Sequence, residues 1–282
     1  MNLSEQIIRI KEMMFINEQD DKPVDYCKDN KDEIYQTYEK AKSWWYSWLN
    51  SEQSKTNFSK DFNLSLEETS KIFEKMRKVV ELTRLVFTTK RLTNAYAETF
   101  CNTPLYCTIT LNCLRQFDSQ KHYTIFVHEI QHALNYYLKF GKYKIDFSQK
   151  LNNIFNEDVM NFDPEKFKQK AYKIGLDDKT ISAMTKAVGF FQETGEKMIF
   201  PNEMMSRIYA VRSMLGINYP EKFTIKDLVD NVKNTNAYYI ILAILNTVEL
   251  DGNFETKIQE LLDVMNSVAK NDKPENMQIN LA

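Results

Sequence analysis

Residues 128–132, His-Glu-Ile-Gln-His, combine two side chains that can bind a metal ion with one that can move a proton. His128 and His132 are four residues apart, so on a helix their imidazoles lie one turn apart on the same side and can reach a single ion. Glu129 lies beside them, where it could take a proton from a water activated by that ion. The alternative is a helix with two ordinary histidines, one buried against the core and one in solvent.

The flanking residues predict the elements that must position this motif. Residues 107–113 alternate apolar and polar side chains, which is the pattern of a half-buried strand. Asp118 or Ser119 can cap a helix that continues to about Leu138, with Gly141 as its stop. Apolar residues flank the two histidines along this helix, so we expect the ligands to face the interior of the protein.

The motif and the strand before it resemble the zincin metallopeptidases, in which a helix bearing His-Glu-x-x-His follows a sheet whose edge strand lines the active-site cleft. The resemblance covers residues 105–215. It implies a bound Zn²⁺ and hydrolysis of a peptide bond in a protein or peptide substrate, with Glu129 as the general base. Thr108, Thr110 and Asn112 would then belong to the edge strand that holds an extended substrate by main-chain hydrogen bonds.

A catalytic zinc site usually has three protein ligands and one open position, and the sequence restricts the third ligand. The metzincin subgroup needs Gly at 135 and His at 138, where this chain has Asn135 and Leu138. The remaining histidine, His122, lies about 120° around the helix from His128, which makes it a poor ligand. The resemblance to the gluzincin branch instead implies a glutamate from a later helix.

Glu203 is the favoured third ligand among several downstream acids. It lies in the first turn of a helix predicted over 201–215, next to that helix's apolar stripe. Arg207 follows one turn later, where it can orient the carboxylate. A surface Glu–Arg pair is the competing interpretation. The competing ligands are Glu193, Glu196 and, with less in its favour, Asp146.

Hydrolysis of an amide also needs a donor, besides the metal, for the oxyanion of the tetrahedral transition state. Tyr209, Arg207 and His122 are the candidates, and Tyr209 is the catalytic residue that we predict. A tyrosine at that place in a helix is more often a packing residue.

The chain as a whole is expected to be mainly α (α+β), with a small sheet packed on the motif helix. Gly and Pro are scarce, six of each, which leaves few turns for a many-stranded β fold. Helical spacing and caps predict helices over 31–50, from Ser65, over 180–188 and 201–215, over the apolar run 237–245, from Thr224, and up to Val268. The expected regions are an N-terminal helical region (1–100), a catalytic core (101–218), a C-terminal helical region (219–270) and a flexible tail (271–282).

Composition limits the partners and the compartment. The net charge of −2 gives no electrostatic case for nucleic acid, and the longest apolar run, 237–245, is far too short to span a membrane. The four cysteines form no Cys-x-x-Cys pair, so we expect free thiols in a reducing cytosol. The charged N-terminus predicts no classical signal peptide, which leaves a cytoplasmic protein or one exported by a dedicated machine.

These observations predict a zinc-dependent endopeptidase. The chain resembles both the effector peptidases that bacteria deliver into host cells and housekeeping cytosolic peptidases. One alternative is a zincin-like module that binds metal or a partner without cutting, although Glu129 would then serve no purpose. The other is an all-helical interaction protein in which the motif arose by chance.

Overall fold

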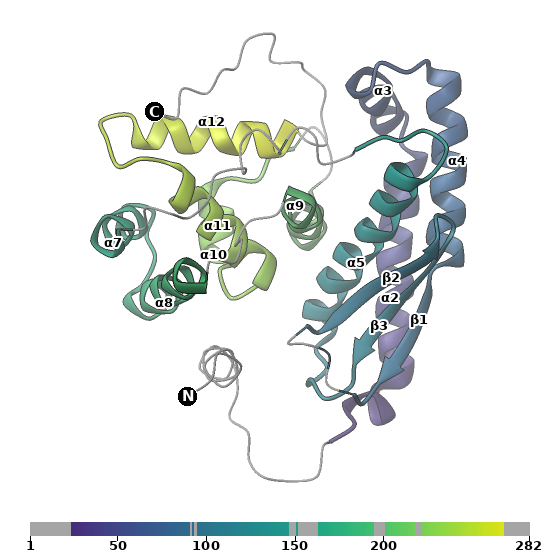
Figure 1. Cartoon of the computed structure of the whole chain (residues 1–282), viewed down its shortest axis with the longest axis horizontal. Helices are drawn as coiled ribbons and strands as arrows, with labels where there is room; N and C mark the ends of the chain where they lie inside the picture. Colours follow the sequence, from purple (N-terminus) through teal and green to yellow (C-terminus); the bar gives the residue numbers. More distant parts are fainter. Residues whose placement is uncertain are drawn as a thin grey trace.

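The protein is mainly helical, with a small mixed sheet among its described residues (Figure 1). The computed structural model describes residues 24–90, 92, 95–146, 151, 163–194, 201–217 and 221–267. The expected flexible tail at 271–282 lies outside these ranges. The predicted mainly α class with a small sheet is confirmed.

The helices before the sheet are α2 (Tyr26–Asn50), α3 (Glu52–Asp61) and α4 (Leu66–Leu82). The predicted helix over 31–50 is confirmed as part of α2. Its aromatic residues belong to the core: Trp45 is fully buried, and its indole Nε1 donates a hydrogen bond to the carbonyl of Val127 at 3.1 Å. This bond fixes α2 against the helix that carries the histidine motif, at the residue before His128.

The predicted start of α4 at Ser65 is also confirmed. The Ser65 side chain accepts a hydrogen bond from the backbone of Glu68, and the Glu68 carboxylate accepts one from the backbone of Ser65. This reciprocal capping box satisfies backbone donors that the first turn of a helix otherwise leaves unpaired.

The sheet contains β1 (Arg84–Thr88), β2 (Ala97–Thr103) and β3 (Tyr106–Asn112), in the order β1-β3-β2. β3 pairs in parallel with β1 and antiparallel with β2. Residues 104–105 form the turn between β2 and β3. The expected boundary between residues 100 and 101 therefore falls inside β2, and the sheet joins residues from both sides of it.

The predicted strand over 107–113 exists as β3, but its predicted place at the sheet edge is wrong. Thr108 pairs with Arg84 on one side and Phe100 on the other, and Thr110 is likewise paired on both sides. Asn112 pairs with β1 and donates its backbone N–H to the carbonyl of Tyr96. An alternating pattern reports which face of a strand is buried and not how many neighbours the strand has. The edge strand on this side is β2.

α5 (Ser119–Phe140) carries the histidine motif, and the predicted helix ends are confirmed. Asp118 is the N-cap and its carboxylate accepts a hydrogen bond from the backbone of Lys121 at 2.6 Å. At the other end the backbone N–H of Gly141 donates to the carbonyl of Tyr137. Buried side chains occur along almost the whole of α5, because α2 and α4 pack on one side of it and α9 on the other (Figure 1).

The second half contains α7 (Pro164–Lys173), α8 (Asp178–Thr194), α9 (Pro201–Leu215), α10 (Ile225–Asp230), α11 (Thr235–Thr247) and α12 (Phe254–Ser267). The helices predicted over 180–188, 201–215 and 237–245 and the cap at Thr224 are confirmed. α9 lies between α5 and α11 (Figure 1). Among the described residues, no helix combines the length and hydropathy of a membrane span.

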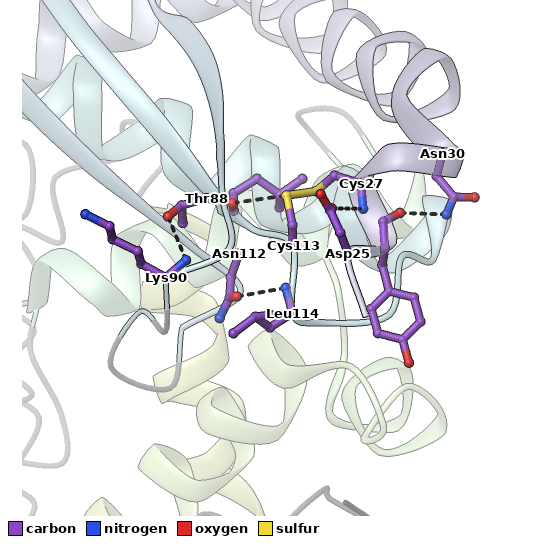
Figure 2. The surroundings of a disulfide bond; sticks show 10 residues. Asp25, Cys27, Asn30, Thr88, Lys90, Asn112, Cys113 and Leu114 are labelled. Carbon is purple, nitrogen blue, oxygen red and sulfur yellow. Dashed lines mark hydrogen bonds between the residues drawn. A yellow bond between two sulfur atoms is a disulfide. The ribbon is translucent and has the colours of Figure 1, made fainter. Parts of the chain in front are cut away.

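The prediction of free thiols is wrong, because all four cysteines are paired. Cys27 bonds Cys113, and Cys101 bonds Cys107. Figure 2 shows that the first pair joins the start of α2 to the residue after β3, where the backbone of Cys113 also donates a hydrogen bond to the carbonyl of Thr88. Spacing along the chain reveals only local pairs, whereas these bonds join residues that folding brings together.

Candidate metal centre

The two motif histidines lie side by side on α5, as the four-residue spacing predicts. Their Nε2 atoms are 3.0 Å apart. The His128 side chain is almost fully buried and that of His132 is partly buried, so both lie in the wall of the protein and not on a solvated helix face. Two imidazole nitrogens at this separation point into a common space, which is the arrangement that two ligands of one ion require.

Glu203, in the first turn of α9, completes the group. Its Oε1 lies 3.0 Å from Nε2 of His132 and its Oε2 lies 3.3 Å from Nε2 of His128. The three side chains can thus offer ligand atoms to one metal ion, with every pair of those atoms within 4.8 Å. Asp146 does not belong to this group. The rival ligand Glu196 and the side chain of Glu193 lie outside the described part of the chain.

Asn236, at the start of α11, contacts the other ring nitrogen of His128, Nδ1. Its Oδ1 lies 3.1 Å from Nδ1 of His128. An amide oxygen only accepts hydrogen bonds, so Nδ1 carries the proton and Nε2 keeps its lone pair for a metal. Asn234 caps α11 by accepting a hydrogen bond from the backbone of Asn236, and its amide also donates to the hydroxyl of Thr124 on α5. The start of α11 is therefore tied to the motif helix.

Arg207 lies one helical turn after Glu203, as predicted. Its Nη2 is 3.5 Å from Oε2 of Glu203, and its guanidinium lies over the ring of Tyr239 on α11, 4.1 Å from the centroid. The stacked ring restricts the guanidinium, so the cation has a defined position beside the carboxylate. This arrangement can orient Glu203 toward the two histidines.

Glu129 lies next to the group in a buried position, with 8 % of its surface exposed. The hydroxyl of Thr99, on β2, lies 2.7 Å from Oε2 of Glu129 and 2.9 Å from its carbonyl oxygen. A carboxylate oxygen can only accept from this hydroxyl, so Thr99 fixes the side chain without neutralising it. β2 thus positions the motif residue that could move a proton.

Burial and neighbouring charges shift the pKa values of these groups in different directions. Burial raises the pKa of Glu129, and the two histidines only partly oppose that shift. Burial would also raise the pKa of Glu203, but its contacts with the imidazoles of His128 and His132 outweigh this effect and hold that pKa well below its ordinary value. For His132, burial lowers the pKa, but the contact with Glu203 outweighs it, so the pKa is raised. Glu203 is therefore anionic and Glu129 is the carboxylate closer to accepting a proton.

A cleft of about 990 Å³ opens beside these groups. β2 and the residues just before it (95–101) form one wall, and α5, α9 and α11 form the rest, with His128, Glu129, His132, Glu203, Arg207, Asn236 and Tyr239 among the lining residues. None of Thr108, Thr110 and Asn112 lines the cleft, in accord with the central place of β3. The strand beside the site is β2, which the sequence analysis did not predict.

The structure places two other candidates away from this cleft. Tyr209 is 1 % exposed and packs against the rings of Trp44, Trp45 and Trp48 of α2, so its predicted catalytic role is wrong. It follows Arg207 by two residues, which turns it to the opposite side of α9. His122 is buried, its Nδ1 lies 2.7 Å from the carbonyl oxygen of Asp118, and burial lowers its pKa. It does not reach the metal group, as its helical position predicted.

Thr99, Asn236 and Tyr239 are the site residues that sequence reasoning missed. β2 has a weak pattern, since three of its seven residues are threonine or asparagine and its burial is low. Tyr239 lies in the apolar run of α11, which indicated a core helix, and Asn236 directly precedes that run. The sequence did contain one signal for Asn236. Asn234 and Asn236 are polar residues at the start of a helix, just before the apolar run, where such side chains can contact a neighbouring element.

No family model, curated protein or solved structure matches this chain.

Proposed function

We propose that this protein is a zinc-dependent endopeptidase. The observation that carries the proposal is the convergence of His128, His132 and Glu203, from helices far apart in sequence, on one point beside Glu129. Two imidazoles and one carboxylate form a nitrogen and oxygen donor set that suits zinc and leaves a fourth position open, as in catalytic sites. The hydrogen bond from His128 to Asn236 supports the same assignment, because histidine ligands usually donate their second nitrogen in this way.

The chain's own residues would divide the work of hydrolysis. Zinc held at this site would polarise the scissile carbonyl and acidify a water molecule. Glu129 would accept the proton of the attacking water and later donate it to the leaving amine, and its raised pKa suits this exchange. Thr99 would keep the carboxylate in place.

Tyr239 replaces Tyr209 as the candidate donor to the oxyanion. It lines the cleft, and its ring lies under Arg207, which in turn lies beside the carboxylate of Glu203. A hydroxyl on this wall can supply the additional hydrogen bond that the developing negative charge needs. Arg207 contributes positive charge to the same wall.

The substrate would be a peptide in extended conformation. Among the described residues β2 has a strand partner on one side only, and the cleft runs along it. A strand with unpaired backbone groups can accept a peptide as an added strand by main-chain hydrogen bonds. The backbone of β2 thus takes the part that the sequence analysis gave to Thr108, Thr110 and Asn112.

The disulfides favour export over a cytoplasmic location within this proposal. Disulfides persist in oxidising compartments and are rare in the cytosol. A secreted peptidase, including one that acts on a host, fits two disulfides better than a housekeeping cytosolic enzyme does.

The second candidate function is a zincin-like module that binds metal without cutting. The buried, hydrogen-bonded Glu129 argues against it, because a purely structural site has no use for a carboxylate whose pKa burial raises. The two functions differ in whether bound metal leads to hydrolysis.

The test compares the zinc-loaded parent with Glu129→Gln and His128→Ala on a mixture of unstructured peptides, with products read by mass spectrometry. We expect the parent to cleave, Glu129→Gln to keep about one zinc per chain without cleaving, and His128→Ala to lose both. Cleavage by Glu129→Gln at the parent rate would overturn the assignment of the base. A parent that binds zinc and cuts nothing in the mixture would favour the binding module.

A further inference from the structure

The end of the cleft beyond His132 carries aromatic side chains of α5, and we name Tyr136 and Phe140 the aromatic end of the cleft. Both line the cleft. Phe140 is 52 % exposed. The rings of Tyr136 and Phe140 are in contact, with centroids 4.7 Å apart.

Single apolar residues on a protein surface are common and need no explanation. These two differ because their rings are in contact and line a concave place beside the metal group. Aromatic rings that line a concave site are typical of a surface that is covered when a ligand binds.

The position of this surface relative to the metal group follows from how β2 and α5 run. The ring of Tyr96 lies 5.8 Å from that of His122, and further along both elements Thr99 contacts Glu129. The two elements therefore run in the same direction. The part of β2 after Thr99 therefore lies toward the same end of the cleft as the last turns of α5.

Distances along α5 convert into positions along a bound peptide. Tyr136 and Phe140 follow His132 by one and two helical turns, about 6 Å and about 12 Å along the axis. An extended peptide advances about 3.3 Å per residue, so these rings lie level with about the second and the fourth residue from the bond at the metal. Side chains two apart in an extended chain point to the same side, so both can meet the rings.

We propose that the aromatic end of the cleft is a subsite for large apolar side chains of the substrate, at about the second and fourth residues on one side of the scissile bond. This inference rests on the proposed peptidase function. Phenylalanine, tyrosine, leucine and methionine side chains are large and apolar enough to pack against these rings. Lys139 also lines this end, with its Nζ 5.9 Å from the centroid of the Phe140 ring, and its charge disfavours basic side chains there.

Binding to an inactive enzyme tests the subsite separately from catalysis. A library of random 12-residue peptides displayed on phage is selected on the zinc-loaded full chain carrying Glu129→Gln, and selected peptides are synthesised for affinity measurements by fluorescence anisotropy. We expect the selected peptides to share large apolar residues two positions apart. Adding Tyr136→Ser and Phe140→Ser should weaken these peptides by about tenfold, because the apolar contact area is lost.

Tyr172→Ser is the matched control, because Tyr172 is 55 % exposed on α7 and does not line the cleft. It should bind the selected peptides as Glu129→Gln alone does. Circular dichroism checks that each variant keeps its helices. Selection of no peptides, of peptides without shared apolar residues, or of peptides that bind the Tyr136→Ser and Phe140→Ser variant equally well would overturn the subsite.

Hydrolysis of the selected peptides by the zinc-loaded parent then tests the proposed function by itself. Selected peptides that bind at the aromatic end and are not cut would support the subsite and contradict the peptidase function. Peptides that are cut at bonds without apolar residues at these positions would support the peptidase function and contradict the subsite.

Discussion

At the scale of single residues, the candidate site depends on side chains outside the five-residue motif. His128 and His132 would supply ligand atoms, but Asn236 sets the proton of His128 and Thr99 sets the position of Glu129. The motif and Glu203 as the third member of the group could be predicted, because they depend on spacing and on a Glu–Arg pair within one helix. Asn236 and Thr99 could not, because their role arises only when α11 and β2 pack against α5.

Replacing Asn236 with alanine should reduce zinc affinity by about 10- to 100-fold, because His128 loses the acceptor that fixes its tautomer. Asn236→Asp keeps an accepting oxygen and should stay within a few-fold of the parent. Zinc titration against a competing chelator measures both variants. Equal affinity in Asn236→Ala and the parent would show that the contact does not orient the ligand.

Tyr239→Phe should lower kcat while leaving zinc affinity and the melting temperature close to those of the parent, because it removes one hydroxyl from the cleft wall. Tyr209→Phe should change neither kcat nor zinc affinity, because its ring packs in the core against tryptophans of α2. Steady-state kinetics on a cleaved peptide and thermal melts separate the two. A loss of kcat in Tyr209→Phe with an unchanged melt would restore Tyr209 as a catalytic residue.

At the scale of elements, local sequence patterns predicted the helices and their caps correctly. They did not predict which strands and cysteines lie next to one another. The caps at Ser65, Asp118 and Thr224 and the helices between them follow from contacts within a few residues along the chain. The place of β3 in the centre of the sheet and the Cys27–Cys113 bond depend on contacts between distant segments, and the Cys101–Cys107 bond depends on the pairing of β2 with β3. None of these leaves a periodic trace in the sequence.

The two disulfides should differ in how much they stabilise the protein. Cys27 and Cys113 are 86 residues apart, whereas Cys101 and Cys107 are 6 apart. A longer closed loop removes more conformational entropy from the unfolded chain, so replacing Cys27 and Cys113 with serine should cost about 2 kcal/mol more than replacing Cys101 and Cys107.

Urea unfolding of the two double-serine variants under non-reducing conditions measures this difference in the free energy of unfolding. Mass measurement of the intact parent before and after reduction and alkylation confirms that both bonds are present. A parent isolated with four free thiols would contradict the pairing, and equal costs for the two pairs would contradict the loop-length argument.

At the scale of the whole molecule, the metal group joins helices that the core already holds. α5 packs against α2 and α9, and α9 packs against α11, so the site lies where the two halves of the described chain meet (Figure 1). The buried residues of α2, α4, α5, α9 and α11 form one continuous core cluster. The fold should therefore not depend on the metal, unlike small zinc domains that are unfolded without it.

Removing zinc with a chelator should abolish hydrolysis while leaving the helical circular dichroism signal unchanged. Free zinc at about 100 times its Kd should then stabilise the protein by about 2.7 kcal/mol, because zinc binds the folded state only. Thermal melts of the stripped and reloaded protein measure both effects. Loss of the helical signal when zinc is removed would mean that the metal stabilises the fold itself. A melting temperature that is the same with and without zinc would argue against a specific site.

The most direct test of the metal centre is an anomalous difference map, recorded at the zinc edge, from a crystal of the zinc-loaded full chain. The account predicts one strong peak at about 2.0–2.2 Å from Nε2 of His128, Nε2 of His132 and a carboxylate oxygen of Glu203. A peak at the histidines that is closed by another carboxylate would remove Glu203 as the ligand. No peak between His128 and His132 would contradict the metal centre and the peptidase function built on it.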